Sequence, residues 1–143
     1  MAFIELKNIN KTFFPNTNRE HYALKNINLV INKGDFITII GGNGAGKSTL
    51  FNAISGVFPL DSGTISIDEK DISSTKEFER AKHISRVFQN PLDNTAPRMT
   101  VAENMALAFN RGDKRTLKFS RNKEILILFE NLLKNLNLGL EQK

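Results

Sequence analysis

Four of the six residues from position 41 to 46 are glycine, and they directly follow an apolar run, FITII, at 36–40. Glycine loses more backbone freedom on folding than any other residue, so such a cluster is costly unless the backbone itself has a task. A lysine and two hydroxyl residues follow at once, in the order Lys47, Ser48 and Thr49. The stretch predicts a loop in which the main chain itself comes close to a ligand.

The spacing Gly41-x-x-x-x-Gly46-Lys47-Ser48 fits the phosphate-binding loop pattern G-x-x-x-x-G-K-[ST]. The context fits as well, because an apolar run enters the loop and an amphipathic helix over 47–55 leaves it. We expect backbone N–H groups to surround a phosphate, Lys47 to reach the β- and γ-phosphates, and the Ser48 hydroxyl to bind Mg²⁺. The alternative is a glycine-rich turn with an incidental lysine. The predicted binding residues of loop 41–49 are Gly41, Asn43, Gly44, Ala45, Gly46, Lys47, Ser48 and Thr49.

Composition limits the other classes of protein. The chain has 143 residues, which is the length of one domain or of part of a larger domain, and its 40% of hydrophobic residues suffice for an ordinary core. No apolar run approaches the ~20 residues that cross a bilayer, and the start, MAFIELKN, does not have the pattern of a secretory signal. Cysteine is absent, which excludes disulfides and Cys-based metal sites and fits a reducing compartment. The net charge of +5 suits an anionic partner without by itself indicating nucleic acid.

The hydrophobic pattern predicts an α/β chain. Alternation predicts strands at 3–9, 26–31 and 64–68, while a strand buried on both faces is expected at 36–40 and a further strand at 83–89. Further helices are expected at 74–82, at 100–109 behind a Thr100–Glu103 capping box, and at 123–139. Predicted helix stops are Gly56, Gly112 and Gly139, and the predicted apolar stripe of the last helix is Ile125, Leu128, Leu132 and Leu136.

The stretch ALKNINLVINKGDFITIIGGNGAGKSTLFNAISGVFPLDSGTISID, at 23–68, resembles the nucleotide-binding subunit of ATP-binding-cassette (ABC) transporters, as does VFQNP at 87–91. The resemblance covers essentially the whole chain. It implies a P-loop NTPase core with an N-terminal antiparallel β-subdomain over 1–96, followed by the start of a helical subdomain over 97–143. Gly42 departs from the family, which usually has proline at this position. The departure changes loop stiffness more than phosphate contact.

The resemblance also implies a site for the base. In the family, an aromatic residue near the end of the first strand stacks on adenine, and Phe13 occupies that position. Phe14 is the runner-up and Tyr22 a weaker candidate. A flat π-face accepts a base without reading its polar edge, so any of these rings is chemically suitable. The alternative for Phe13 is ordinary core packing.

Gln89 matches the glutamine that, in the family, meets Mg²⁺ or the attacking water. Lys47 and Gln89 are therefore the predicted catalytic residues, and Ser48 and Gln89 the predicted metal ligands, with ATP and Mg²⁺ as cofactors. A surface glutamine before a turn is the alternative. The loop after it, 90–100, is expected to contact a membrane subunit. The family further implies a second ATPase subunit, an indirect solute-binding protein, and a cytoplasmic position on the inner face of the membrane.

Other polar residues carry less information. The segment 111–123 has six basic residues and one acidic residue, and we interpret it as a solvated linker between two helices. The alternatives are contact with lipid headgroups or with the cytoplasmic face of the transporter, and after these contact with nucleic acid. The two histidines, His21 and His83, are not spaced in the sequence as metal ligands are. Turn roles are assigned to Asp61, Asp68 and Asp71.

The implied function is that of an ATP-hydrolysing subunit that powers solute transport. The pattern TAPxMTxxENxALAxxRG at 95–112 resembles that of bacterial uptake systems, including those for amino acids. The chain contains no LSGGQ-like signature, Walker B Asp-Glu pair or switch histidine. We therefore interpret it as the N-terminal portion of a longer ATPase, nearly inactive alone, with strands that lack neighbours and apolar faces left open. Partner subunits determine the transported substrate.

Two other classes remain open at this point. The first is a non-transport ABC-type ATPase in DNA repair or translation. Only 42 positions separate Lys47 from Gln89, which resembles transporters, whereas repair relatives insert much more and those with zinc modules need cysteine. The second is a P-loop kinase or GTPase, which would lack the sequence context of Gln89, and a GTPase would in addition need an N-K-x-D motif to read the base.

Overall fold

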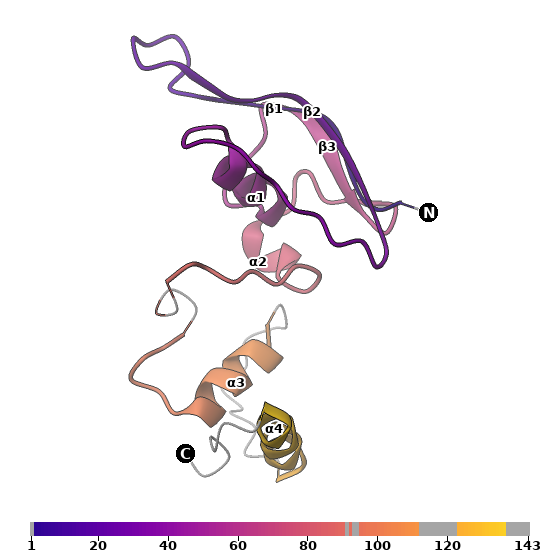
Figure 1. The fold of residues 1–143 in the computed structure, drawn as a ribbon, viewed down its shortest axis with the longest axis vertical. Coiled ribbons are helices and arrows are strands. Elements are labelled where there is room, and N and C mark those ends of the chain that lie inside the picture. The colour runs from indigo at the N-terminus through magenta and orange to yellow at the C-terminus, as the bar shows by residue number, and fades with distance from the viewer. Residues whose placement is uncertain (1, 91, 93–94, 112–122, 137–143) are drawn as a thin grey trace. The chain divides into compact units, whose positions relative to one another are not determined.

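The computed structural model describes residues 2–90, 92, 95–111 and 123–136, in two compact units, Met1–Ile84 and Ser85–Lys143. The first unit contains a four-stranded antiparallel sheet with strand order β2-β1-β3-β4. Figure 1 labels β1, β2 and β3 of this sheet. Its strands are β1 (Ala2–Phe13), β2 (His21–Asn32), β3 (Ser62–Ile67) and β4 (Lys70–Asp71). Its helices are α1 (Lys47–Ser55) and α2 (Glu77–Arg80). The three strands predicted from alternation are thus formed, the first two of them longer than expected.

One face of the sheet packs against α1. Leu6 of β1 pairs with Leu29 of β2 and with Ile65 of β3, and Leu6 and Ile65 are completely buried. From α1, Leu50 and Ala53 join the same cluster. Burying these side chains holds α1, and with it the glycine-rich loop before α1, against the sheet. The buried cluster consists of Leu6, Ile9, Leu24, Leu50, Ala53, Ile65, Ile67 and Ile72.

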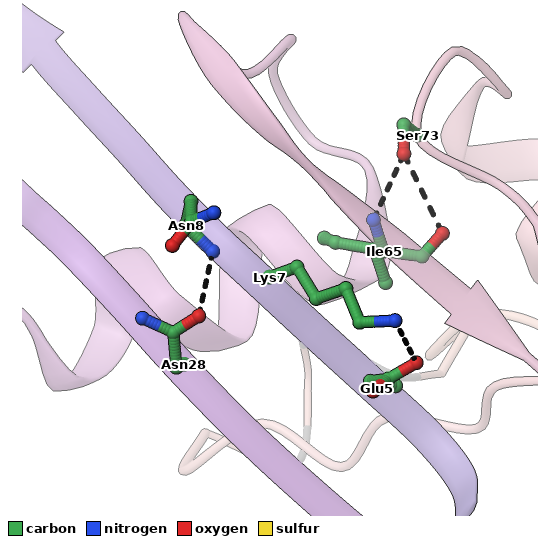
Figure 2. A network of polar contacts seen from close by, with 6 residues as sticks. All are labelled: Glu5, Lys7, Asn8, Asn28, Ile65 and Ser73. Atoms are coloured by element: carbon green, nitrogen blue, oxygen red, sulfur yellow. Dashed lines mark hydrogen bonds and ion pairs between the residues drawn. The ribbon is translucent and has the colours of Figure 1, made fainter.

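Asparagines organise irregular pairing between β1 and β2, whose register shifts on both sides of Ile9. Asn8 and Asn26 have left-handed backbone angles, with φ of 51° and 49°. The Asn8 N–H donates to Asn28 Oδ1 at 2.9 Å (Figure 2), and the Asn26 N–H donates to Asn10 Oδ1 at 2.8 Å. Asparagine tolerates the left-handed region and replaces a missing ladder bond with its amide. Each bulge is therefore satisfied by an asparagine of the opposite strand.

Two more polar contacts lie near this part of the sheet (Figure 2). The Ile65 N–H donates to Ser73 Oγ at 2.8 Å, because β4 has only two residues and cannot pair with the whole of β3. Lys7 and Glu5 form an ion pair at 2.8 Å on the exposed face of β1. Ser73 thus provides a hydrogen-bond partner for an N–H group at the edge of β3, whereas the exposed ion pair contributes little to stability.

The predicted strands at 36–40 and 83–89 are wrong for this chain, because neither segment forms a strand. Phe36 and Ile40 are 95% and 90% exposed, and Val87 is 89% exposed. A strand is stable only where a neighbouring strand completes its ladder of hydrogen bonds. Among the described residues, no strand pairs with either segment. The outcome agrees with the expectation that these segments lack neighbours and leave apolar surface open.

Two helices, α3 (Val101–Phe109) and α4 (Lys123–Leu136), form the described regular structure of the second unit. The predicted capping box is confirmed: the Glu103 N–H donates to Thr100 Oγ1 at 3.2 Å, and the Thr100 N–H donates to Glu103 Oε2 at 2.8 Å. Helix α2 is shorter than its predicted range, 74–82. The predicted stops at 112 and 139, and all of the basic segment except Arg111 and Lys123, lie outside the described residues.

The buried side of α4 differs from the predicted stripe. Phe129 is the buried residue, and its ring packs edge-on against Phe109 with centroids 6.0 Å apart. By contrast, Leu128, Leu132 and Leu136 are exposed. The helix carries apolar residues on more than one side, so contact with α3 and not periodicity selected the buried side. Neither α4 nor any other helix in the described ranges is long and apolar enough to cross a membrane.

Candidate nucleotide-binding site

The loop at 41–46 takes a backbone path that needs glycine at two positions. Gly44 and Gly46 have φ of 80° and 83°. At Gly46 the space is also closed, because a Cβ there would lie 2.6 Å from the Ala23 carbonyl oxygen of β2. At Gly44 nothing lies within 4 Å of a Cβ. The close approach of Gly46 to β2 therefore seats the loop on the sheet, while Gly44 only needs its backbone conformation.

Lys47, the first residue of α1, folds back over the loop. Its Nζ donates to the carbonyl oxygens of Gly41 and Gly42, each at 2.7 Å. The Ala45 N–H also donates to the Gly42 oxygen, at 3.3 Å. A positive charge is thus held over the loop by carbonyl dipoles alone, so an incoming phosphate meets an ammonium that has no competing carboxylate among the described residues.

The N-terminus of α1 is suited to an anion. No side-chain cap hydrogen bond forms at Gly46, and the first turn contains no acidic residue. The first N–H groups of a helix have no intrahelical acceptor and carry partial positive charge. Ser48, in this turn, is exposed. The loop, the lysine and the helix end together fit a di- or triphosphate, and the hydroxyl of Ser48 is an oxygen ligand of the kind that Mg²⁺ prefers.

Phe13 lies in a small aromatic cluster. Its ring packs edge-on against Phe58 with centroids 5.3 Å apart, and Lys11 Nζ lies 5.7 Å from its centroid. Phe14 and Tyr22 are 64% and 65% exposed. Phe13 therefore has a packing role, which was its alternative interpretation, and the two exposed rings stay available. The adenine contact of Phe13 remains a prediction.

Asp61 does more than close a turn. Its Oδ1 accepts from Lys11 Nζ at 2.9 Å, and its Oδ2 accepts from the Thr12 N–H at 2.5 Å. The hydrogen bond from Lys11, aided by that from Thr12, lowers the pKa of Asp61 although partial burial opposes the shift. This ion pair joins the last residues of β1, which ends at Phe13, to the start of β3. Lys11 was not among the predicted site residues, and no local sequence pattern marks it.

Gln89 is an exposed residue of the second unit, whereas the phosphate loop belongs to the first.

In the loop that follows Gln89, Asn104 of α3 holds the chain at Ala96. The Ala96 N–H donates to Asn104 Oδ1 at 2.8 Å, and Asn104 Nδ2 donates back to the Ala96 oxygen at 3.1 Å. Asn104 was not among the predicted site residues either. The sequence signal for Asn104 was that asparagine, a residue type that prefers caps and turns, occupies an interior position of a predicted helix.

The letters N-K-G-D at 32–35 spell the base-reading motif of GTPases, but here they close a turn. The Asp35 N–H donates to the Asn32 oxygen at 3.1 Å, and the Asn32 N–H donates to Asp35 Oδ2 at 2.7 Å. The turn precedes the phosphate loop, and in it Asp35 Oδ2 accepts from both the N–H and the Nδ2 of Asn32. These residues therefore do not indicate a GTPase.

The comparisons with known proteins agree with this arrangement. The family model described as ABC transporter matches residues 24–143. The tyrosine transport ATP-binding protein of Clostridioides difficile is 40% identical over 97% of this chain and 55% of its own length. The chain spans about half the length of this curated relative.

Solved structures give the same result. The ATP-binding cassette MJ1267 of an ABC transporter matches 97% of this chain and 55% of its own, with a TM-score of 0.75 and 30% identity. The dimeric cassette MJ0796, bound to ADP and Pi, matches 89% of this chain and 55% of its own, with a TM-score of 0.69 and 31% identity. The fold and the loop thus define a P-loop ATP-binding cassette, and the predicted fold class is confirmed. The chain belongs to the ABC transporter ATP-binding family.

Proposed function

We propose that the chain binds Mg-ATP through loop 41–49 and forms part of an ATPase subunit that powers solute transport. The observation that carries the proposal is Lys47 Nζ, held 2.7 Å from two loop carbonyls at the uncapped N-terminus of α1. In this proposal Lys47 binds the β- and γ-phosphates. The remaining loop contacts come from backbone N–H groups of Gly41, Asn43, Gly44, Ala45, Gly46 and Thr49.

The metal and the base extend this site. We propose Ser48 and Gln89 as the residues that would hold Mg²⁺, which supplies charge compensation between phosphates when bound. Gln89 would also orient the attacking water. Phe13 is proposed to stack on adenine, and the exposure of Phe14 supports keeping that residue as the second choice.

Family membership supports partners beyond this chain. The loop at 90–100 would contact a membrane subunit, a second ATPase subunit would complete a dimer, and a solute-binding protein would act indirectly. The cassette MJ0796 is dimeric, which supports the second of these contacts. The first relative named above is a tyrosine transport ATP-binding protein, which supports a role in the transport of a small solute. The protein would then lie on the cytoplasmic face of the membrane, with division into an ATP-binding core at 1–96 and a helical subdomain from 97.

We also propose that the 143-residue chain alone hydrolyses ATP barely or not at all. A phosphoryl-transfer site that lacks water activation and closure loses most of its rate. The chain carries no LSGGQ-like signature motif, and its Asp-Glu pair at 68–69 lies in a turn after the alternating strand β3, not after a continuous apolar strand. The family match favours the transporter over an ATPase of DNA repair or translation.

ATP titration by calorimetry tests the proposal. Lys47→Ala removes a charge-assisted contact to phosphate, and we expect ATP affinity to fall by roughly 1.5–3 kcal/mol. Lys25→Ala is the matched control, because Lys25 is an exposed lysine on β2 of the same unit. Equal ATP affinity in the wild type and Lys47→Ala would reject the assignment of the loop.

A further inference from the structure

Arg80, the last residue of α2, is only 2% exposed although it carries a charge. Its guanidinium donates to main-chain carbonyls and to one hydroxyl. Nη1 donates to the Ala53 and Ile54 oxygens at 2.8 and 2.9 Å, and Nη2 donates to the Ser73 oxygen at 3.0 Å. Nε donates to the oxygen and to Oγ1 of Thr75, at 3.2 and 3.1 Å.

The burial of this charge is compensated without an ion pair at contact distance. Desolvation lowers the pKa of Arg80, while the more distant Asp71 carboxylate opposes that shift. A buried charge is costly unless its donors are satisfied, and arginine has five N–H donors in a rigid planar fork. Here the fork is met by oxygens from α1 and from the segment between β4 and α2. The arrangement therefore depends on the shape of the guanidinium as well as on its charge.

Two of these acceptors belong to the C-terminal end of α1. The last carbonyls of a helix lack intrahelical partners and carry partial negative charge, which a cation stabilises. Gly56, the C-cap of α1, has φ of 79°, and a Cβ there would lie 2.8 Å from Arg80 Nε. Glycine at this position leaves room for the guanidinium. Arg80 of α2 thus binds the C-terminal end of α1, the helix whose first residue is Lys47.

Helix α1 has nine residues, so it is only about 14 Å long. At one end, Gly46 lies against the Ala23 carbonyl of β2. At the other end, the Arg80 side chain donates to the carbonyls of Ala53 and Ile54. Because α1 is short, a displacement of this end would tilt the helix and shift the N-terminal N–H groups that are proposed to bind phosphate.

We propose that Arg80 is a positioning residue for the phosphate loop, and that it acts by clamping the C-terminal end of α1. The inference rests on the proposed binding of ATP at loop 41–49. The main-chain oxygen of Arg80 also accepts from the N–H groups of His83 and Ile84, each at 2.9 Å. The same residue therefore ends the turn from which the chain continues toward Gln89.

The test measures ATP affinity and thermal stability on the full chain for the wild type and three variants. Arg80→Lys keeps the charge and loses the planar fork, and we expect ATP binding to weaken roughly tenfold at a temperature where circular dichroism shows a folded chain. Ile67→Val is the control, because it removes one methylene from the buried cluster without touching the bonds at the end of α1. It should lower the melting temperature and leave ATP affinity unchanged.

Arg80→Ala adds a readout that general destabilisation does not move. Guanidinium ion at low millimolar concentration should restore ATP affinity in this variant, and ethylammonium at the same concentration should not. Equal recovery with both ions, or no recovery in a folded variant, would overturn the proposal. Where Arg80→Ala does not fold, Arg80→Lys decides: wild-type affinity in that variant overturns the clamp and leaves ATP binding intact. Failure of the wild type itself to bind ATP would instead reject the proposed function, and the clamp with it.

Discussion

Gly63 of β3 lies so close to Asn8 of β1 that a Cβ on Gly63 would be 2.5 Å from the Asn8 carbonyl oxygen. Asn8 is the bulged residue of β1, with a left-handed φ of 51°, and Gly63 itself has φ of 96°. The bulge in one strand thus requires glycine in the next. This pair of residues determines how closely β3 approaches the strand that ends at Phe13.

Gly63→Ala should lower the free energy of unfolding by roughly 3 kcal/mol, because backbone strain and a steric clash add together. Gly34→Ala is the matched control, since Gly34 has φ of 91° but nothing within 4 Å of a Cβ. Strain alone should cost this variant about 1–2 kcal/mol. Urea denaturation measures both values, and equal losses would show that the contact with Asn8 is unimportant.

Phe13→Ala should weaken ATP and GTP binding alike, by roughly 1–3 kcal/mol, because stacking does not read the polar edge of a base. Phe58→Ala is the control, since it removes the same edge-on ring contact while leaving Phe13 in place. Nucleotide titration of both variants separates stacking from packing. A larger loss in Phe14→Ala would assign the base contact to Phe14, and a hundredfold preference between the two nucleotides would argue against stacking altogether.

The Lys11–Asp61 ion pair should make stability depend on pH. The pKa of Asp61 is lowered in the folded chain, so its contribution is complete above the ordinary carboxyl pKa and is lost as pH falls through the folded value. Because the Asp61 side chain is 40% exposed, screening limits the effect of Asp61→Asn to about 1 kcal/mol or less at neutral pH. The stabilities of the wild type and Asp61→Asn should converge as pH falls below the ordinary carboxyl pKa. A difference that persists undiminished there would contradict the ion pair as its source.

The exposed apolar segment at 36–40 should make the chain self-associate, because Phe36 and Ile40 present open apolar surface and the backbone beside them forms no ladder. Light scattering should show particle size rising with concentration in the wild type and less so in a Phe36→Ser, Ile40→Ser double variant. Phe78→Ser, at an exposed phenylalanine of α2, is the control and should behave like the wild type. A monodisperse wild-type monomer that also releases phosphate at the rate of a complete subunit would contradict both this expectation and the proposed low activity.

Local features were predictable from the amino-acid sequence. The phosphate loop depends on glycines and a lysine within eight consecutive positions, and the Thr100–Glu103 capping box depends on residues one turn apart. Both use short-range geometry that holds wherever the chain lies. Strands β1, β2 and β3 were also recognised, because alternation records which face of a strand is buried.

Long-range contacts decided the rest. Apolar runs at 36–40 and 83–89 look like strands, yet a strand exists only beside a partner, and no described strand pairs with them. The buried side of α4 depended on Phe109, and the packing of Phe13 depended on Phe58, which is distant in the sequence. Arg80 reads as a surface residue of a charged helix. It is buried because carbonyls at the end of α1, 26 and 27 positions away, satisfy its donors, and no periodicity in the sequence encodes such a meeting.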